Sequence, residues 1–178
     1  MLGKVLQVLK GAAPATKRVA VLWDPIRTTP TAAASYTDAS NRAASGLGMS
    51  LESFAAARAD DMAATLDRIA ASAPDVVFVG IDLRTFSKFG EIAAFAVHRK
   101  LVTIGIAPQF ANAGGLLCFG PDVPELLART ISYVNRASCA ARSRPSCPWR
   151  YHVNLKTAKV IVIKIPRSVL LRADRVIE

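Results

Sequence analysis

Residues 74–82 constrain the fold most, because they contain an almost unbroken apolar run. The run Val76-Val-Phe-Val-Gly-Ile81 is interrupted only by a glycine. A strand with one wet face alternates apolar and polar residues, whereas a strand buried on both faces has a continuous apolar run. The stretch therefore predicts a central strand of a parallel sheet. Ligands of such sheets bind just beyond the carboxyl ends of the strands, which here directs attention to Asp82.

Similar units lie on both sides of this stretch. Further strands are expected at residues 19–23, 51–57, 101–106 and 116–119. Helices are expected at residues 2–10, 32–47, 60–71 and 87–99, and another after Asp122. This order is typical of an α/β fold, a Rossmann-like parallel sheet with helices on both faces. We predict four parallel strands within residues 17–110, centred near Val21, Phe54, Val77 and Thr103.

The pattern changes after Arg136. Residues 138–149 have neither a helical nor a strand period. Residues 151–155 are compatible with a strand, and residues 156–163 with a short helix or a strand. Residues 166–177 predict a final amphipathic helix, with an apolar face of Val169, Leu170, Ala173, Val176 and Ile177.

Length and charge limit the classes of function. A chain of 178 residues fits one domain, or one domain and part of a second. No apolar run approaches the roughly 20 residues that span a bilayer, and the first ten residues lack the apolar core of a secretory signal. As written, the chain is therefore expected to stay in the cytoplasm. Of the net charge of +10, residues 136–178 carry ten basic against two acidic residues. This basic tail is compatible with phosphate contacts to nucleic acid, but a solvated surface explains it better.

The chain offers no clear catalytic or metal-binding set. The cysteines have no zinc-like spacing, and either Cys139 and Cys147 form a disulfide or all three cysteines are thiols. Asp24 and Asp82 follow strands, yet acid–base chemistry would need a nucleophile or metal beside them. The glycines of residues 45–50 follow a helix rather than a strand, which argues against a dinucleotide loop. We therefore expect no catalytic residue, no metal site and no cofactor.

Polar and aromatic residues at the expected strand ends suit the binding of a small polar ligand. We predict that the ligand contacts Asp24, Pro25, Asp82, Arg84, Thr85, Gln109 and Phe110. Trp23 and Phe119 lie at strand ends of the same kind. The alternative role of all these strand-end residues is local packing and hydrogen bonding within loops.

Three segments resemble one family of substrate-binding proteins of ABC transporters. They are Lys17-Arg-Val-Ala-Val-Leu-Trp-Asp-Pro25, Ala113-Gly-Gly-Leu-Leu-Cys-Phe-Gly-Pro121, and a closing segment from Asn154-Leu-Lys-Thr-Ala-Lys159 through Ile165-Pro166 to Leu170-Leu-Arg-Ala-Asp-Arg-Val-Ile177. The resemblance implies a type I periplasmic binding protein fold, in which two α/β lobes close around a ligand. Residues 1–112 would be the second lobe, and residues 113–178 the crossover and return segments of a first lobe that is largely missing.

The same resemblance implies a function. The chain would be the solute-binding component of an ABC importer, located in the periplasm, with a permease as partner and a small polar ligand, for which an amino acid is the candidate class. Some members of the family bind aromatic amino acids. A stand-alone α/β enzyme or sensory domain using Asp24 and Asp82 is the main alternative, and nucleic-acid binding through the basic tail a further one.

The resemblance also raises the question of what covers the return segments. Without a first lobe, the strands at residues 116–119 and 151–155 would present unpaired backbone edges, and the final helix would expose its apolar face. Such surfaces favour pairing with another chain. We therefore expect a homodimer.

Overall fold

The computed structural model describes residues 2–23, 30–56, 62–121 and 149–178, with the side chains of residues 30–36 excepted. Its first half contains α1 (Leu2–Ala12), β1 (Arg18–Trp23), α2 (Pro30–Ser45), β2 (Ser50–Ala55), α3 (Met62–Ser72), β3 (Val76–Val79), α4 (Leu83–Ser87) and α5 (Phe89–His98). The second half contains β4 (Val102–Gly105), α6 (Pro108–Asn112), β5 (Leu117–Pro121), β6 (Trp149–Asn154), α8 (Leu155–Val160), α9 (Arg167–Leu170) and β7 (Arg175–Ile177). The expected helix after Asp122 and the possible Cys139–Cys147 disulfide lie outside the described residues.

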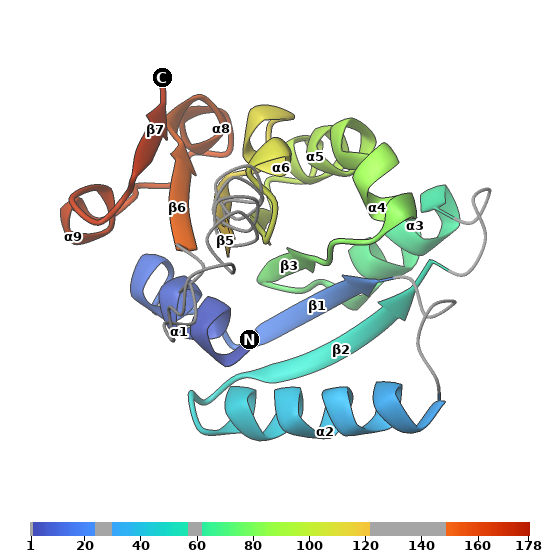
Figure 1. The fold of residues 1–178 in the computed structure, drawn as a ribbon. Coiled ribbons are helices and arrows are strands. Elements are labelled where there is room, and N and C mark those ends of the chain that lie inside the picture. Colours follow the sequence, from blue (N-terminus) through green and yellow to red (C-terminus); the bar gives the residue numbers. More distant parts are fainter. Residues whose placement is uncertain (1, 24–29, 57–61, 122–148) are drawn as a thin grey trace, which may run out of the picture.

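The strands form one sheet in the order β2-β1-β3-β4-β5-β6-β7 (Figure 1). All neighbouring pairs are parallel except β5 and β6, which are antiparallel. The predicted four-stranded parallel sheet and the α/β fold class are therefore confirmed. Strands from both sides of residue 112 belong to this sheet, and the division into two lobes at that residue stays a prediction.

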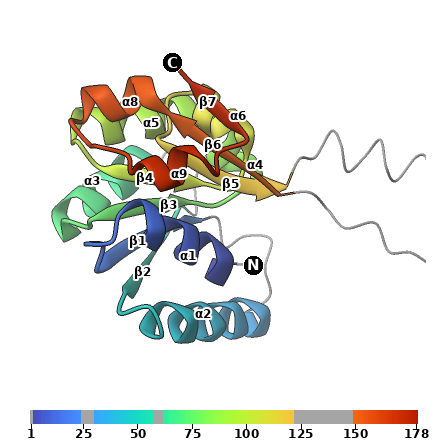
Figure 2. The same ribbon diagram turned by 90° about the vertical axis from the view of Figure 1, so that its left-hand side faces the viewer.

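The two faces of the sheet carry two separate cores. Residues of β1 and β3 alternate between them: Val19 and Val76 belong to one core, and Ala20 and Val77 to the other. Helices α1, α8 and α9 contribute to the first core, while α3, α5 and α6 contribute to the second. All four residues of β3 are buried, as the unbroken apolar run predicts. Figure 2 shows α1 and α2 on one side of the sheet.

The prediction of a helix over residues 166–177 is wrong. The helix α9 ends at Leu170, and the chain then extends beside β6 as β7. Asp174 holds the extended segment beside β6. Its backbone N–H donates to the Tyr151 carbonyl at 2.8 Å, and its Oδ2 accepts from the Tyr151 N–H at 2.7 Å. Val169 is buried, and Leu170 packs partly buried against the core.

The expected unpaired strand edges are also absent from the described part of the chain. Strand β5 pairs with β4 and β6, and β6 pairs with β7 as well. The two edges of the sheet are β2 and β7. The homodimer was expected because of those unpaired edges, so this argument for it no longer holds. The homodimer stays a prediction.

Candidate binding site at the carboxyl ends of the parallel strands

The carboxyl ends of β1 and β3 lie side by side because the strands are parallel and in register. At this end, the Gly80 N–H donates to the Leu22 carbonyl at 2.9 Å. A Cβ atom at residue 80 would lie 3.1 Å from that same oxygen, which is tighter than an ordinary contact. The one glycine in the apolar run thus lets the two backbones approach where the strands end.

The residues after Gly80 form a rigid turn that opens α4. Asp82 is the N-cap, and its Oδ1 accepts from the backbone N–H groups of Arg84 at 3.0 Å and Thr85 at 2.8 Å. The Asp82 N–H donates back to the Thr85 hydroxyl at 3.2 Å, which completes a capping box. That hydroxyl also donates to the Gly80 carbonyl at 2.9 Å. Asp82 is therefore held in one position relative to β3.

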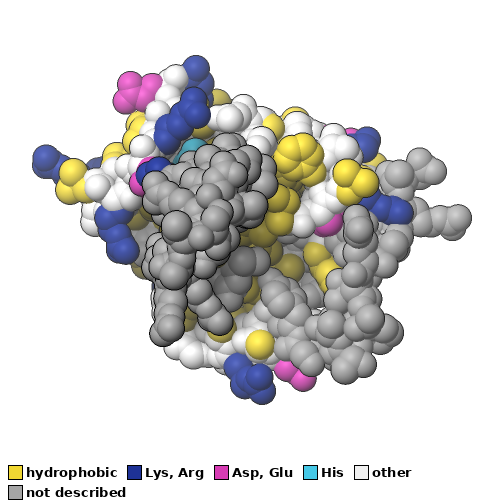
Figure 3. Space-filling model, viewed as in Figure 1, with side chains coloured by type: hydrophobic (Ala, Val, Ile, Leu, Met, Phe, Trp, Pro, Cys, Tyr) yellow, Lys and Arg dark blue, Asp and Glu magenta, His cyan; other side chains and the backbone are white. Residues whose placement is uncertain are grey.

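Three large apolar side chains next to Asp82 in the chain or on α4 are exposed at the surface. Leu83 is 75% exposed, Ile81 48% and Phe86 45%. In the space-filling view, hydrophobic side chains reach the surface near α4 (Figure 3). Apolar side chains gathered beside one fixed polar group are typical of binding surfaces rather than of an ordinary solvated turn.

The aromatic residues here divide between surface and core. Phe86 contacts Phe89, and Phe89 contacts Phe110, each with ring centroids 5.2 Å apart. Phe110 is fully buried, and a Cβ at Gly105 or Gly115 would come within 2.6 or 2.3 Å of its ring. In this structure the Phe110 ring is a core element that fills the space left by two glycines, and Phe86 is the aromatic ring that reaches the surface.

The predicted contact residues are only partly brought together. Asp82, Arg84 and Thr85 share the capped turn, where Asp82 and Arg84 are half-buried and Thr85 is buried with its hydroxyl bonded internally. Gln109 is exposed at the start of α6, after the neighbouring strand β4. Asp24 and Pro25 lie outside the described residues. Whether these residues contact a ligand stays a prediction.

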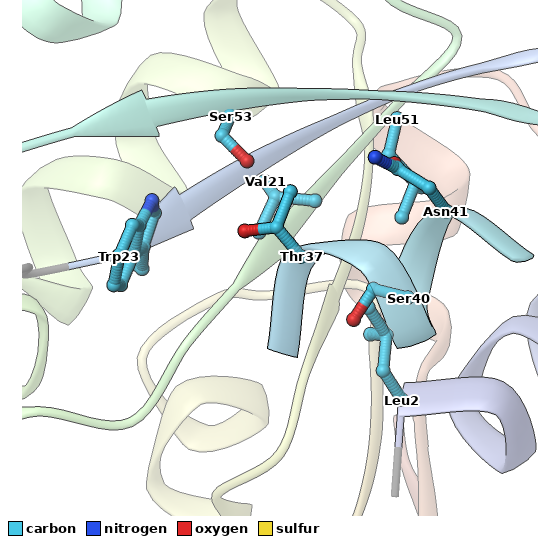
Figure 4. Close-up of a pocket in the computed structure, with 8 residues that line it drawn as sticks. All are labelled: Leu2, Val21, Trp23, Thr37, Ser40, Asn41, Leu51 and Ser53. Carbon is cyan, nitrogen blue, oxygen red and sulfur yellow. The ribbon is translucent and has the colours of Figure 1, made fainter. Parts of the chain in front are cut away.

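The end of β1 adds a small cavity rather than a ligand pocket. Trp23, Thr37 and Ser53 line it, and Figure 4 shows the side chains of α2 facing those of β1 and β2. Its volume of about 20 Å³ has room for one water molecule but not for an amino acid. The buried Trp23 Nε1 has no hydrogen-bond partner in the described part of the chain, so a water here would satisfy it.

Hydrogen bonds from Asn154 and Thr157 hold the end of α6 against the C-terminal segment. Both residues belong to the closing segment that resembles the substrate-binding family. Asn154 Nδ2 donates to the Ala111 carbonyl at 2.9 Å, while its Oδ1 accepts from the Thr157 N–H at 3.0 Å. The Thr157 hydroxyl donates to the Gly114 carbonyl at 2.7 Å. The segment Asn154–Thr157 thus caps α8 and fixes the carboxyl-terminal side of α6, and with it the position of Gln109.

The cysteine among the described residues, Cys118, is buried. Burial raises the pKa of the Cys118 thiol to about 12, so this thiol is protonated at neutral pH and a poor nucleophile. No group of three or more potential metal ligands occurs among the described residues. Within those residues, no helix is both long and apolar enough to cross a membrane.

Sequence reasoning missed the exposed apolar residues of this site. The sequence predicts a helix only from residue 87, whereas in the structure α4 begins at Leu83. The available signal was Asp82 followed three residues later by Thr85, a spacing that suits a capping box. This spacing is typical of a helix that starts at residue 83, with Leu83 in its first turn.

Comparisons with known proteins support the fold. No protein-family model matches the chain, and no curated protein sequence matches it. Among solved structures, a conserved domain protein from Vibrio cholerae is similar over 98% of this chain, with a TM-score of 0.82 and 22% identity. An ABC domain in complex with L-Trp from Streptococcus pneumoniae has a TM-score of 0.80 and 22% identity over 99% of this chain. The ligand-free, open structure of a substrate-binding protein with adhesive properties from Clostridium difficile has a TM-score of 0.72 and 19% identity over 97%.

This chain spans only part of the proteins that it resembles. It covers 60% of the Vibrio and Streptococcus chains and 58% of the Clostridium chain. The resemblance to substrate-binding proteins is thus confirmed at the level of the fold. The chain has the α/β fold found in part of these three structures.

Proposed function

We propose that this chain forms one wall of a binding site for a small polar solute, with an amino acid as the solute class. The observation that carries the proposal is that Ile81, Leu83 and Phe86 are exposed in the same turn and helix whose start is capped by the fixed carboxylate of Asp82. Such a surface suits a ligand with an apolar side chain and a cationic or hydroxyl group. The fold supports the proposal, because one structure of the same fold is a complex with L-Trp.

In this proposal the site binds and does not transform its ligand. Asp82 accepts a hydrogen bond from the ligand's ammonium group, and Arg84 binds its carboxylate, since an Arg–carboxylate pair is strong and directional. Ile81, Leu83 and Phe86 contact the ligand's side chain. A second body, corresponding to the remaining two-fifths of the similar structures, closes over the opposite side. A permease of an ABC importer would then receive the solute.

Calorimetric titration of the full chain with L-tryptophan tests the proposal. With only one wall present, we expect saturable binding with a dissociation constant of about 1 mM, equivalent to about 4 kcal/mol. Substituting Arg84→Ala should weaken binding by about 1–3 kcal/mol, because it removes a charge-assisted hydrogen bond. Arg99→Ala is the matched control, since Arg99 is exposed at the far end of α5.

Two substitutions of Asp82 separate binding from folding. Asp82→Ser removes the carboxylate but keeps a side-chain oxygen for the cap, whereas Asp82→Ala removes both. We expect both variants to lose affinity, and only Asp82→Ala to lose about 1 kcal/mol of stability as well. Unchanged affinity in Asp82→Ser and Arg84→Ala would place the site elsewhere.

A further inference from the structure

A second hollow lies away from the carboxyl-end surface, on the face of the sheet covered by α1. It is a groove of about 550 Å³ between α1, the strands β5 and β6, and α9. This volume falls within the range of small-molecule sites. Helix α1 contributes Lys4, Gln7, Val8 and Gly11; the strands contribute Phe119, Trp149 and Tyr151; and the C-terminal segment contributes Ser168, Val169, Arg172 and Asp174. None of the residues predicted to contact the solute lines it.

The strand side of the groove is a continuous aromatic wall. The rings of Phe119 and Trp149 lie 5.0 Å apart at 32°, and those of Phe119 and Tyr151 lie 6.2 Å apart nearly at right angles. Phe119 and Trp149 are half-buried. Their rings are held by pairing between β5 and β6, because Phe119 lies opposite Tyr151 in the antiparallel register. A planar ligand would find a preorganised stacking surface here.

Tyr151 adds an unused hydrogen-bonding group to this wall. The residue is only 6% exposed, and its hydroxyl has no hydrogen-bond partner within the described residues. Burial raises its pKa to about 12, although the nearby Arg172 lowers it, so the hydroxyl carries its proton at neutral pH. A buried hydroxyl without a partner is costly to the fold, and a ligand oxygen would satisfy it.

The charges that border the groove favour an anion. Lys4 and Arg172 line it from opposite sides, and neither forms an ion pair in the described part of the chain. The acidic residue at the groove, Asp174, is directed to β6: its Oδ2 accepts from the Tyr151 N–H at 2.7 Å and its Oδ1 pairs with Arg150 at 3.4 Å. The uncompensated charge is therefore positive.

We propose that the groove between α1, β5–β6 and α9 is a second binding site, for a small aromatic carboxylate. The ligand ring stacks against Phe119 and Trp149, and the carboxylate accepts from Arg172 and from the Tyr151 hydroxyl. A ligand with only an aromatic ring would leave the Tyr151 hydroxyl without a partner. An aliphatic anion would leave the rings of the aromatic wall exposed to water. The combination of wall, hydroxyl and cations thus selects one chemical class.

Calorimetric titration with benzoate tests the proposal, with benzamide and acetate as matched probes. Benzamide keeps the ring without the charge, and acetate keeps the charge without the ring. We expect saturable binding of benzoate, and affinities at least about tenfold lower for the two other probes. The variants Arg172→Ala and Arg167→Ala each remove one exposed arginine, but Arg167 does not line the groove.

The variants give a result that folding alone would not produce. We expect Arg172→Ala to weaken benzoate binding about tenfold and Tyr151→Phe about threefold, while Arg167→Ala and Asp82→Ser change it less than about twofold. Tyr151→Phe should unfold no earlier than the wild type, because it removes an unpaired buried hydroxyl. The proposal is overturned if benzoate does not saturate, if Arg172→Ala binds it as well as Arg167→Ala does, or if Asp82→Ser abolishes binding.

Discussion

The two halves of the sheet are stabilised in different ways. Strands β1 and β3 are apolar on both faces and lie between two cores. Strand β6 is apolar on one face only: Tyr151 and Val153 belong to a core, whereas His152 and Asn154 are buried polar residues on alternate positions. Parallel strands of the first kind need little beyond burial, while β6 depends on specific hydrogen bonds. The second half should therefore be more sensitive to the loss of single polar or glycine residues.

The largest expected effect tests how closely β5 approaches the chain after β4. A Cβ atom at Gly120 would lie 1.7 Å from the Ile106 carbonyl oxygen, and backbone cannot move aside as a flexible side chain can. We expect Gly120→Ala to lower the free energy of unfolding by about 3 kcal/mol or more. Denaturant titration measures this. The control Gly90→Ala lies in a helix with open space around it and should raise stability by up to about 1 kcal/mol.

A second substitution tests the side-chain hydrogen bonds by which Asn154 links α6 to the start of α8. Asn154→Ala removes the cap of α8 and leaves the Ala111 carbonyl without its buried donor, so we expect a loss of about 2–3 kcal/mol. Asn154→Ser keeps a capping oxygen and should lose roughly half as much. Equal stability of the two variants in thermal denaturation would show that the cap contributes nothing, because both variants lose the bond to Ala111.

A third substitution, at the end of α8, should raise the stability of the protein. Val162 has φ of 61° at the end of α8, where the Ile163 N–H donates to Ala158 at 3.0 Å and the Val162 N–H to Lys159 at 3.3 Å. Such a helix ending favours glycine, and a branched residue is strained there. We expect Val162→Gly to add about 1 kcal/mol of stability.

The end of α2 provides the reverse experiment. Gly48 occupies the equivalent position with φ of 67°. Replacing it by Ala should cost about 1 kcal/mol. If Val162→Gly and Gly48→Ala shift the unfolding midpoint in the same direction, the conformation at one of the two helix ends is not the one described.

The smallest expected effect concerns pH and the parallel half. The carboxylate of Asp75 accepts from the backbone N–H groups of Arg18 and Lys17, both at 2.8 Å. These bonds lower its pKa below the ordinary value of 3.8. The unfolded chain therefore binds a proton first, so the stabilisation is present above about pH 4 and is lost as the pH falls further. Because Asp75 is exposed, we expect less than about 1 kcal/mol. Asp75→Asn should unfold with a weaker dependence on pH below 4.

The same difference explains what the sequence could predict. The run at β3 and the alternation of helices and strands predicted the parallel half because each element buries a continuous pattern of its own. The strand β7 is three residues long, and its pairing depends on Asp174 contacting Tyr151, 23 residues earlier. A helical period over residues 166–177 could not reveal such a distant contact. At the proposed site, the end of the strand before Asp82 was predicted correctly, but the burial of Phe110 depends on Gly105 and Gly115 and is a property of packing.

Mapping amide chemical shifts during titration with L-tryptophan tests the central claim most directly. The claim is that a solute binds at the carboxyl ends of the parallel strands. We expect saturable shifts at residues 80–86 and 107–110 that persist in the Arg172→Ala variant, whether or not residues of the second groove also shift. Shifts confined to the groove residues Lys4, Phe119 and Tyr151, or no saturable shift up to about ten times the expected millimolar dissociation constant, would contradict the account.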